Sequence, residues 1–332
     1  MNQTVTDPTA PSRRRFDLAD WGERAGLILA WLAVIAGFGF LMPSTFLSWA
    51  NFSTIFGSQA VLVIVTLGLI IPLTANDFDL SIAQVLTMSS MIVALLNVWM
   101  DWPIALAVLA ALAAGLVVGV VNAAIILFFR IHSLIVTLGV GTFIHGLTLW
   151  MSGSQTISGI DMALIRAVIV TRFLGIPLAF YYAILLAVLI WYAFGYTAAG
   201  QRLLFVGRGR DVARLSGVRV DRVRAGALVA SALMGALAGV VYSGTTGAAD
   251  PSSGLSYLLP AFAAAFLGAT TIQPGRFNAA GSVVAVYFLV TGITGLSLLG
   301  LGTHIQDLFY GGALVVAVAL SQLVRGREER LS

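Results

Sequence analysis

The chain has no cysteine and no lysine among its 332 residues. The lack of cysteine excludes disulfides, thiolate catalysis and Cys-based metal sites. The lack of lysine excludes Schiff-base chemistry and the phosphate-binding P-loop, which needs a lysine on the β- and γ-phosphates. Histidine is scarce, and His132, His145 and His304 lie far apart in the sequence. We therefore expect no metal site in this chain.

Charged residues are also few. They make up 10% of the chain, whereas a soluble domain carries about 25%, and 59% of the residues are hydrophobic. A surface in water cannot be built from so few charges, so lipid must be the solvent for most of it. The isoelectric point near 9.8 is typical of nucleic-acid binding, but the arginines follow the ends of apolar runs. We therefore expect membrane lipid, and no nucleic acid, as a partner.

Ten apolar runs are close to the length of about 20 residues that crosses the hydrocarbon core as a helix. They predict an all-α membrane protein, a polytopic bundle of about ten transmembrane helices. If two short runs are re-entrant, eight remain. A transmembrane domain over 24–324 then lies between an N-terminal segment, 1–23, and a tail, 325–332. The runs cover residues 24–42, 58–74, 81–98, 103–129, 134–151, 174–195, 225–243, 257–272, 279–299 and 305–323.

The arginines predict the orientation of the bundle, because Lys and Arg in short loops mark the cytoplasmic side. With the N-terminus inside and the loops alternating, 16 of the 18 arginines fall inside. Only Arg166 and Arg172 fall outside, in the long loop 152–173. One missed or invented span would destroy this agreement. We therefore predict an even number of spans, with both termini cytoplasmic.

The longest inside loop, residues 202–224, carries a cluster of arginines. Residues 211–216 are predicted to form a short helix, and Gly217 suits the left-handed position after a helix end. Val212 and Leu215 lie three residues apart and therefore share one face of that helix. An apolar face in a cytosolic loop needs a cover. The sequence alone leaves lipid headgroups, the protein's own helix ends and a partner protein as alternatives.

A polar break separates the second and third runs. Asn76, Asp77, Asp79 and Ser81 stand there, at a depth where ionisable residues are costly and usually face a cavity or a partner. Asp79 and Ser81 also suit a helix N-cap. Capping and a role in a transport pathway or gate are both open. An acid–base enzyme is a third alternative, but no nucleophile or metal ligand accompanies the carboxylates, so we expect no catalytic residue.

The loop helix carries a family resemblance. Asp211-Val212-Ala213-Arg214-Leu215-Ser216-Gly217 resembles the Glu-Ala-Ala-x-x-x-Gly loop of bacterial ABC importer permeases, and especially their ribose/xylose/galactose (monosaccharide) branch. Asp79-Leu80-Ser81 is similar to the Asp-Leu-Ser that follows the second span of that family. The family's Ile-Val-Thr-Leu-Gly is matched by residues 135–139, which include Thr137 and Gly139.

This resemblance implies a permease subunit that moves a monosaccharide or related polyol through the bacterial inner membrane. Other small solutes (a furanose signal, a nucleoside, a branched-chain amino acid) and a stand-alone secondary transporter are the alternatives. It implies three protein partners: a cytoplasmic ABC ATPase that holds ATP and Mg, a second permease chain, and a substrate-binding protein at the outer loops. This chain would bind no cofactor. The implied ATPase-coupling residues are Arg210, Asp211, Val212, Ala213, Arg214, Leu215, Ser216 and Gly217. The implied pathway or gate residues are Asn76, Asp77, Asp79, Ser81, Thr137 and Gly139.

Overall fold

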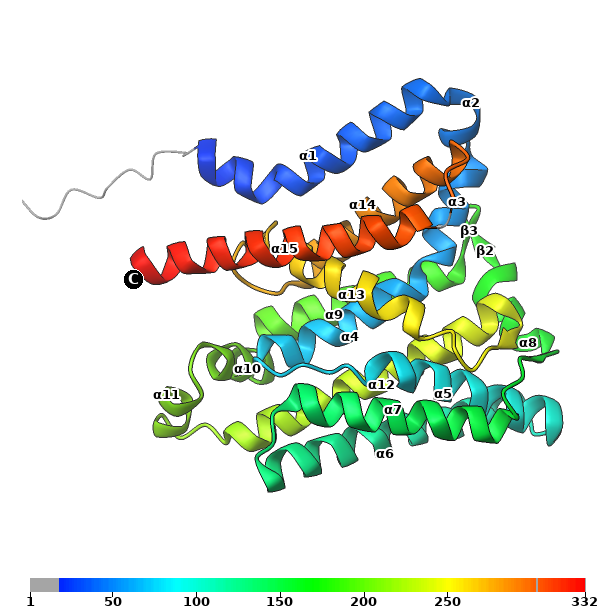
Figure 1. Cartoon of the computed structure of the whole chain (residues 1–332), viewed down its shortest axis with the longest axis horizontal. Coiled ribbons are helices and arrows are strands. Elements are labelled where there is room, and N and C mark those ends of the chain that lie inside the picture. Colours follow the sequence, from blue (N-terminus) through cyan, green and yellow to red (C-terminus); the bar gives the residue numbers. More distant parts are fainter. Residues whose placement is uncertain (1–17, 303, 332) are drawn as a thin grey trace, which may run out of the picture.

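The computed structural model describes residues 18–302 and 304–331, with side chains over 25–302 and 304–321. The chain is a bundle of long helices that run roughly parallel or antiparallel (Figure 1). The first half comprises α1 (Leu18–Leu41), α2 (Pro43–Phe46), α3 (Trp49–Ser58), α4 (Ala60–Thr74), α5 (Ile82–Ala94), the π-helical turn η1 (Leu95–Trp99), α6 (Ile104–Phe129), α7 (Ser133–Ser152), β1 (Ile157–Ser158), α8 (Met162–Ile165) and the π-helical turn η2 (Arg166–Val170). The second half comprises β2 (Arg172–Phe173), β3 (Ile176–Pro177), α9 (Leu178–Tyr196), α10 (Ala198–Arg208), α11 (Arg210–Leu215), α12 (Val220–Thr246), β4 (Ala248–Ala249), α13 (Leu255–Gly268), α14 (Ala279–Leu298) and α15 (His304–Leu331).

Each of the ten predicted runs overlaps a helix, and the multi-pass architecture is therefore confirmed. The number ten is not. Within the described residues, seven helices are long and apolar enough to cross a membrane. The pair α3 and α4, bent by 41° at Gln59, gives an eighth. The part of α1 whose side chains are described, Ala25–Leu41, and α13 are apolar but shorter.

The predicted terminal boundaries differ from the helices. Residues 1–17 of the predicted N-terminal segment lie outside the described residues, and 18–23 belong to α1. The predicted tail from 325 onward continues α15 as far as Leu331. The start of α1, the end of α15, and α10 with α11 lie at the same end of the bundle (Figure 1). Which side of the membrane this end faces stays a prediction.

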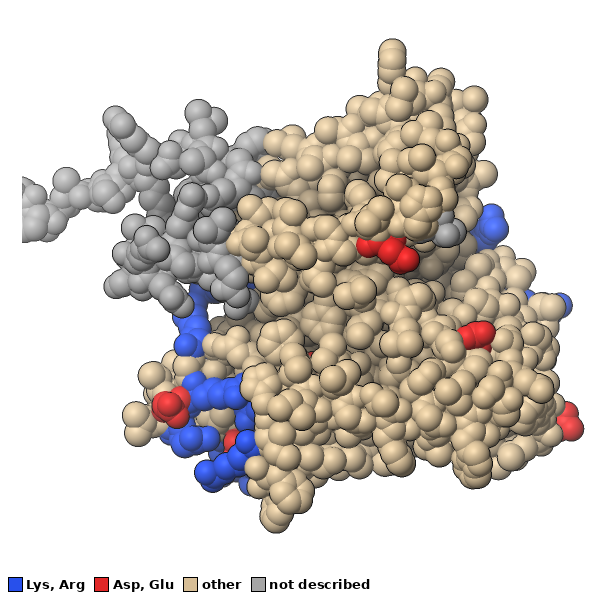
Figure 2. Space-filling model, viewed as in Figure 1, with Lys and Arg blue, Asp and Glu red and all other residues tan. Residues whose placement is uncertain are grey.

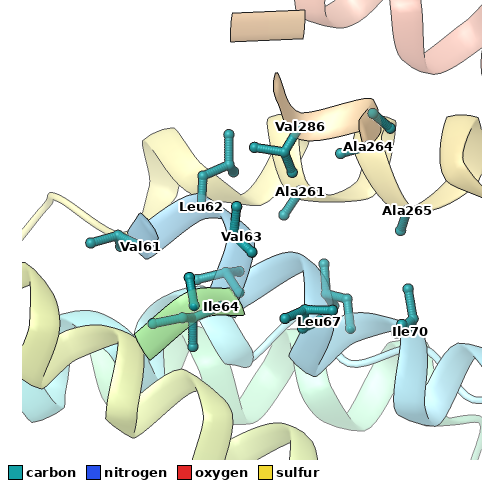
Figure 3. Packing of buried hydrophobic residues seen from close by; sticks show 14 of the residues in the cluster. Val61, Leu62, Val63, Ile64, Leu67, Ile70, Ala261, Ala264, Ala265 and Val286 are labelled. Carbon is teal, nitrogen blue, oxygen red and sulfur yellow. The ribbon is translucent and has the colours of Figure 1, made fainter. Parts of the chain in front are cut away.

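The core is built around α4. This helix is apolar on every side, and all of its residues except Ile71 are buried, as expected for a helix enclosed by others. Val61, Leu62 and Leu67 belong to a cluster that includes Ala261 of α13 and Val286 of α14 (Figure 3). The small side chains of α13 allow close approach, which matters in lipid because van der Waals packing drives helix association there.

Helix α12 lies between α5 and α6 and touches both through glycines. A Cβ at Gly119 of α6 would lie 2.8 Å from the Cα of Val229, and a Cβ at Gly235 of α12 would lie 2.9 Å from the carbonyl oxygen of Ile82. No side chain fits at either position. Gly119 of α6 and Gly235 of α12 therefore pack helices within this chain.

The two ends of the bundle differ in charge and in structure. Arginines gather at the end formed by α10 and α11 (Figure 2). At the opposite end, the predicted loop 152–173 is partly ordered as β1, α8, η2 and β2. Ile157 of β1 pairs with Ala249 of β4 in an antiparallel ladder, and the Thr156 hydroxyl donates a 2.8 Å hydrogen bond to Asp250. Two segments far apart in the sequence thus form one surface.

Candidate functional site

The predicted loop helix exists as α11, which begins at Arg210 and ends at Leu215. Gly217, just beyond it, has φ +81°, the left-handed conformation expected there. Its neighbour α10 is capped by Thr197, whose hydroxyl accepts a 3.2 Å hydrogen bond from the Gly200 amide. Gly209 joins the two helices in an extended conformation.

One side of α11 is anchored and the other is bare. Ala213 is fully buried in a cluster with Val206 of α10 and Val220 of α12. Val212 is 58% exposed and Leu215 is 89% exposed. The helix therefore presents two apolar side chains outward on a fixed base. The sequence allowed three alternatives for what covers this apolar face: lipid headgroups, the protein's own helix ends or a partner protein. The structure rules out the second for the described residues, because no helix end among them covers Val212 and Leu215.

The ion pairs of Arg214 contribute little to the position of α11. Arg214 lies 3.7 Å from Asp211 and 3.9 Å from Asp221, and all three side chains are mostly exposed. Exposed ion pairs are typically worth less than about 1 kcal/mol.

The polar break after α4 is a segment without helical structure, residues 75–81. It begins where Asn76 adopts φ +56°, a left-handed conformation that asparagine tolerates better than most residues. The amide of Asp77 then bonds to the carbonyl of Pro72 and closes the helix end. The chain continues to Ser81 and enters α5 at Ile82.

Asp77 joins this break to the arginine-rich loop. Its side chain is almost fully buried, and both of its carboxylate oxygens accept 2.7 Å hydrogen bonds from Arg224 of α12. Arg210, the first residue of α11, donates to the same carboxylate at 3.0 Å. The guanidinium of Arg210 also lies 3.0 Å from the carbonyl oxygens of Ala75 and Asn76. We call these three residues (Asp77, Arg210 and Arg224) the Asp77 clamp.

A second contact supports the clamp from α10. The side-chain amide of Asn76 donates a 2.6 Å hydrogen bond to the carbonyl of Gly207. A side chain at position 207 would collide with the carbonyl oxygen of Thr74. Glycine is therefore the residue that lets α10 approach the end of α4.

The rest of the break is fastened to α7. The amide of Phe78 donates to the Ser133 hydroxyl at 2.9 Å, and the amide of Leu80 donates to the Thr137 hydroxyl at 3.1 Å. Non-helical backbone at membrane depth is tolerated only where the protein satisfies its polar groups. Ser133 and Thr137, both buried, perform this task.

Asp79 and Ser81 form a buried polar cluster with α6. One oxygen of Asp79 accepts hydrogen bonds from the Ser81 amide at 3.0 Å and the Ser81 hydroxyl at 2.6 Å. The side-chain amide of Asn122 donates to the same hydroxyl at 2.8 Å. Ser81 occupies the N-cap position of α5, but its side chain makes no capping bond. Of the two side chains considered as caps, Asp79 accepts from the amide of the N-cap residue Ser81, and the Ser81 side chain does not cap.

The structure brings together most of the predicted site residues. Asn76, Asp77, Asp79, Ser81 and Thr137 surround one break, and Arg210 connects it to α11. Gly139 is different, because it lies on the exposed outer face of α7 and a Cβ there would touch nothing.

Arg224, Ser133 and Asn122 were not predicted as site residues. Their roles depend on contacts over 147, 55 and 41 residues of sequence, respectively. The only signal for Arg224 was its place at the edge of the arginine cluster. Ser133 and Asn122 carried none beyond being polar residues in or beside apolar runs.

The fold is that of a multi-pass membrane protein, with a bare surface helix fixed to a break in a membrane segment. Residues 51–318 match a family described as the permease component of branched-chain amino acid transport systems, and the chain belongs to this family. No solved structure matches the chain.

Three relatives resemble the chain over almost its whole length. It is 26% identical to the D-allose transport system permease protein of Escherichia coli K12 over 95% of this chain and 96% of the relative. It is 27% identical to the ribose import permease protein of the same strain, over 95% and 98%. It is 27% identical to the galactose/methyl galactoside import permease protein of Salmonella typhimurium LT2, over 93% and 97%. The resemblance to monosaccharide ABC permeases is thereby confirmed. The chain is the permease subunit of a transport system and not an enzyme.

Proposed function

We propose that this chain carries a monosaccharide or a related polyol across the inner membrane, by alternating access driven by a separate ABC ATPase. The sugars in the names of the three relatives support the carbohydrate class. ATP and Mg would be bound by the ATPase. A second permease chain would complete the pathway, and the surface around β1 and β4 would meet a substrate-binding protein.

The Asp77 clamp is the observation that carries the coupling part of this proposal. In it, α11 receives movement from the ATPase through Val212 and Leu215. The guanidinium of Arg210 passes that movement directly to the break, because it bonds both the carboxylate of Asp77 and two backbone carbonyls of the segment. The break, with Asp79, Ser81 and Thr137, acts as the gate or as part of the pathway.

The coupling is tested by replacing Arg210 and Arg224 together with glutamine in the complete transporter, reconstituted in proteoliposomes. We expect the ATPase to remain bound and to hydrolyse ATP, while sugar uptake per ATP falls at least about tenfold. The matched control replaces Arg208 and Arg276 with glutamine, which removes the same charge from the same end of the bundle. Neither residue belongs to an ion pair found among the described side chains. Equal losses of uptake and hydrolysis, or no loss, would show that the clamp does not couple.

The substrate is tested separately, in the same proteoliposomes with the cognate binding protein. Uptake is measured for a panel of allose, ribose, xylose, galactose, a nucleoside and branched-chain amino acids. We expect ATP-dependent uptake of at least one sugar. Uptake of branched-chain amino acids alone would refute the sugar assignment and leave the coupling proposal intact.

A further inference from the structure

A cavity of about 920 Å³ opens at the arginine-rich end, between α9, α10 and α12. Ser216, Gly217 and Val218, which follow α11, form part of its lining. It is separate from the Asp77 clamp, because none of the three clamp residues lines it. Its volume falls within the range of sites that bind small organic molecules.

The walls of the cavity are apolar and belong to membrane helices. Ile190 and Phe194 contribute from α9, and Val223 and Ala227 contribute from α12. Both helices are among those long and apolar enough to span. The cavity therefore runs from the arginine-rich end along two helices that are apolar enough to stand in hydrocarbon.

Three arginines line the same cavity: Arg202 of α10, Arg219 and Arg222. All three are exposed, and none has an acidic partner among the side chains that the structure describes. Every ion pair found there uses Arg210, Arg214 or Arg224 instead. The cavity thus combines an uncompensated positive charge with an apolar interior.

We propose that this cavity binds an acidic phospholipid. The phosphate lies among Arg202, Arg219 and Arg222, and an acyl chain covers the apolar walls of α9 and α12. A free phosphate would satisfy the arginines and leave those walls bare. The charge also matches the membrane, because anionic lipids attract basic residues at the cytoplasmic surface.

The position of the cavity gives this lipid a specific consequence. The residues that follow α11 line the cavity, so a bound lipid contacts the chain at the C-terminal end of α11, the helix on which the ATPase is proposed to dock. The lipid site does not depend on which solute the chain carries.

The test uses the purified full-length chain in nanodiscs that contain equal amounts of phosphatidylglycerol and phosphatidylcholine. Co-purified lipid is counted by native mass spectrometry. We expect retained phosphatidylglycerol, with the preference lost roughly a hundredfold when Arg202, Arg219 and Arg222 all become glutamine, at about fivefold for each arginine. The control replaces Arg130, Arg208 and Arg276, which removes the same charge outside the cavity. Equal retention by the two triple variants, or no preference in the unmodified chain, would overturn the proposal.

A second variant keeps every charge and fills the space. Gly226 lines the cavity, and a Cβ there would meet nothing within 4 Å, so Gly226→Trp is expected to fold and to exclude the lipid. Gly146→Trp is the control, on the exposed face of α7, where a Cβ also meets nothing. If Gly226→Trp retained the lipid, the lipid would lie outside this cavity and the proposal would fail. If millimolar inorganic phosphate alone displaced the lipid, the site would take a free anion instead. Loss of the ATPase or of a second permease copy from Gly226→Trp, with lipid unchanged, would assign the cavity to a protein interface.

Discussion

The carboxylate of Asp77 forms ion pairs with two guanidinium groups, those of Arg210 and Arg224. Arg224 is the more buried partner, with 13% of its side chain exposed, while 37% of the Arg210 side chain is exposed. Arg210 can therefore return to water if the carboxylate is removed, and Arg224 cannot do so fully. The cost of breaking the clamp should fall mainly on Arg224.

We predict that Asp77→Ala lowers the free energy of unfolding by about 3–5 kcal/mol, the cost of leaving one buried partner of an ion pair uncompensated. Unfolding is measured by denaturant titration in mixed micelles. The double variant Asp77→Ala/Arg224→Ala should lose less than the sum of its two single variants, by at least about 1 kcal/mol. Additive losses would mean that the two residues do not interact in the membrane.

The hydroxyls of Ser133 and Thr137 hold the backbone of the break. Removing either one leaves a partly buried amide without its acceptor, at a cost of about 1–3 kcal/mol. We predict that Ser133→Ala and Thr137→Val increase the rate of amide hydrogen exchange over residues 77–81, measured by mass spectrometry. Thr142→Val is the control, because the exposed Thr142 bonds only within its own helix. Unchanged exchange in both site variants would contradict this role.

At the scale of elements, α11 is a helix whose position and partner are decided by different residues. Ala213 fixes it to α10 and α12, whereas Val212 and Leu215 make no comparable contact within the chain. A change at the exposed residues should therefore alter binding without altering folding.

We predict that Leu215→Asp abolishes co-purification of the ATPase and leaves the unfolding midpoint of the isolated chain unchanged. The physical reason is that a charge would have to be buried in the docked complex, while it stays in water in the free chain. Leu174→Asp is the matched control, an exposed leucine in the loop between β2 and β3. Retained ATPase binding by Leu215→Asp would show that α11 is not the docking element.

At the scale of the whole molecule, the orientation predicted from the arginines is directly testable, because the natural chain has no cysteine. Single cysteines are introduced at Thr156, beside β1, and at Ser216, after α11. A membrane-impermeant maleimide should label Thr156→Cys in intact spheroplasts and Ser216→Cys only after the membrane is opened. The reverse pattern would invert the proposed orientation.

Most of the fold could be predicted from the sequence, because a long apolar run in lipid is stable only as a membrane-spanning helix. The short helix α11 could be predicted as well, from Gly217 and the spacing of Val212 and Leu215. The Asp77 clamp could not, since nothing in one sequence pairs residues 147 positions apart. Gly139 shows a different limit. It stands two residues after Thr137, and at about 100° per residue two neighbours at that spacing face opposite sides of a helix. The motif at residues 135–139 therefore contains both a buried position, Thr137, and an exposed one, Gly139.

The Asp77 clamp also decides what can be exchanged between permeases of this family. A chimaera that transplants residues 202–224 to redirect a permease to another ATPase would carry Arg210 and Arg224 into a host whose segment 75–81 was never matched to them. The transferable unit is discontinuous: the donor loop, which already contains Gly207, must travel with its own carboxylate, Asp77. Grafts that respect this boundary should assemble, and those cut at the ends of the loop should fail before any question of ATPase recognition arises.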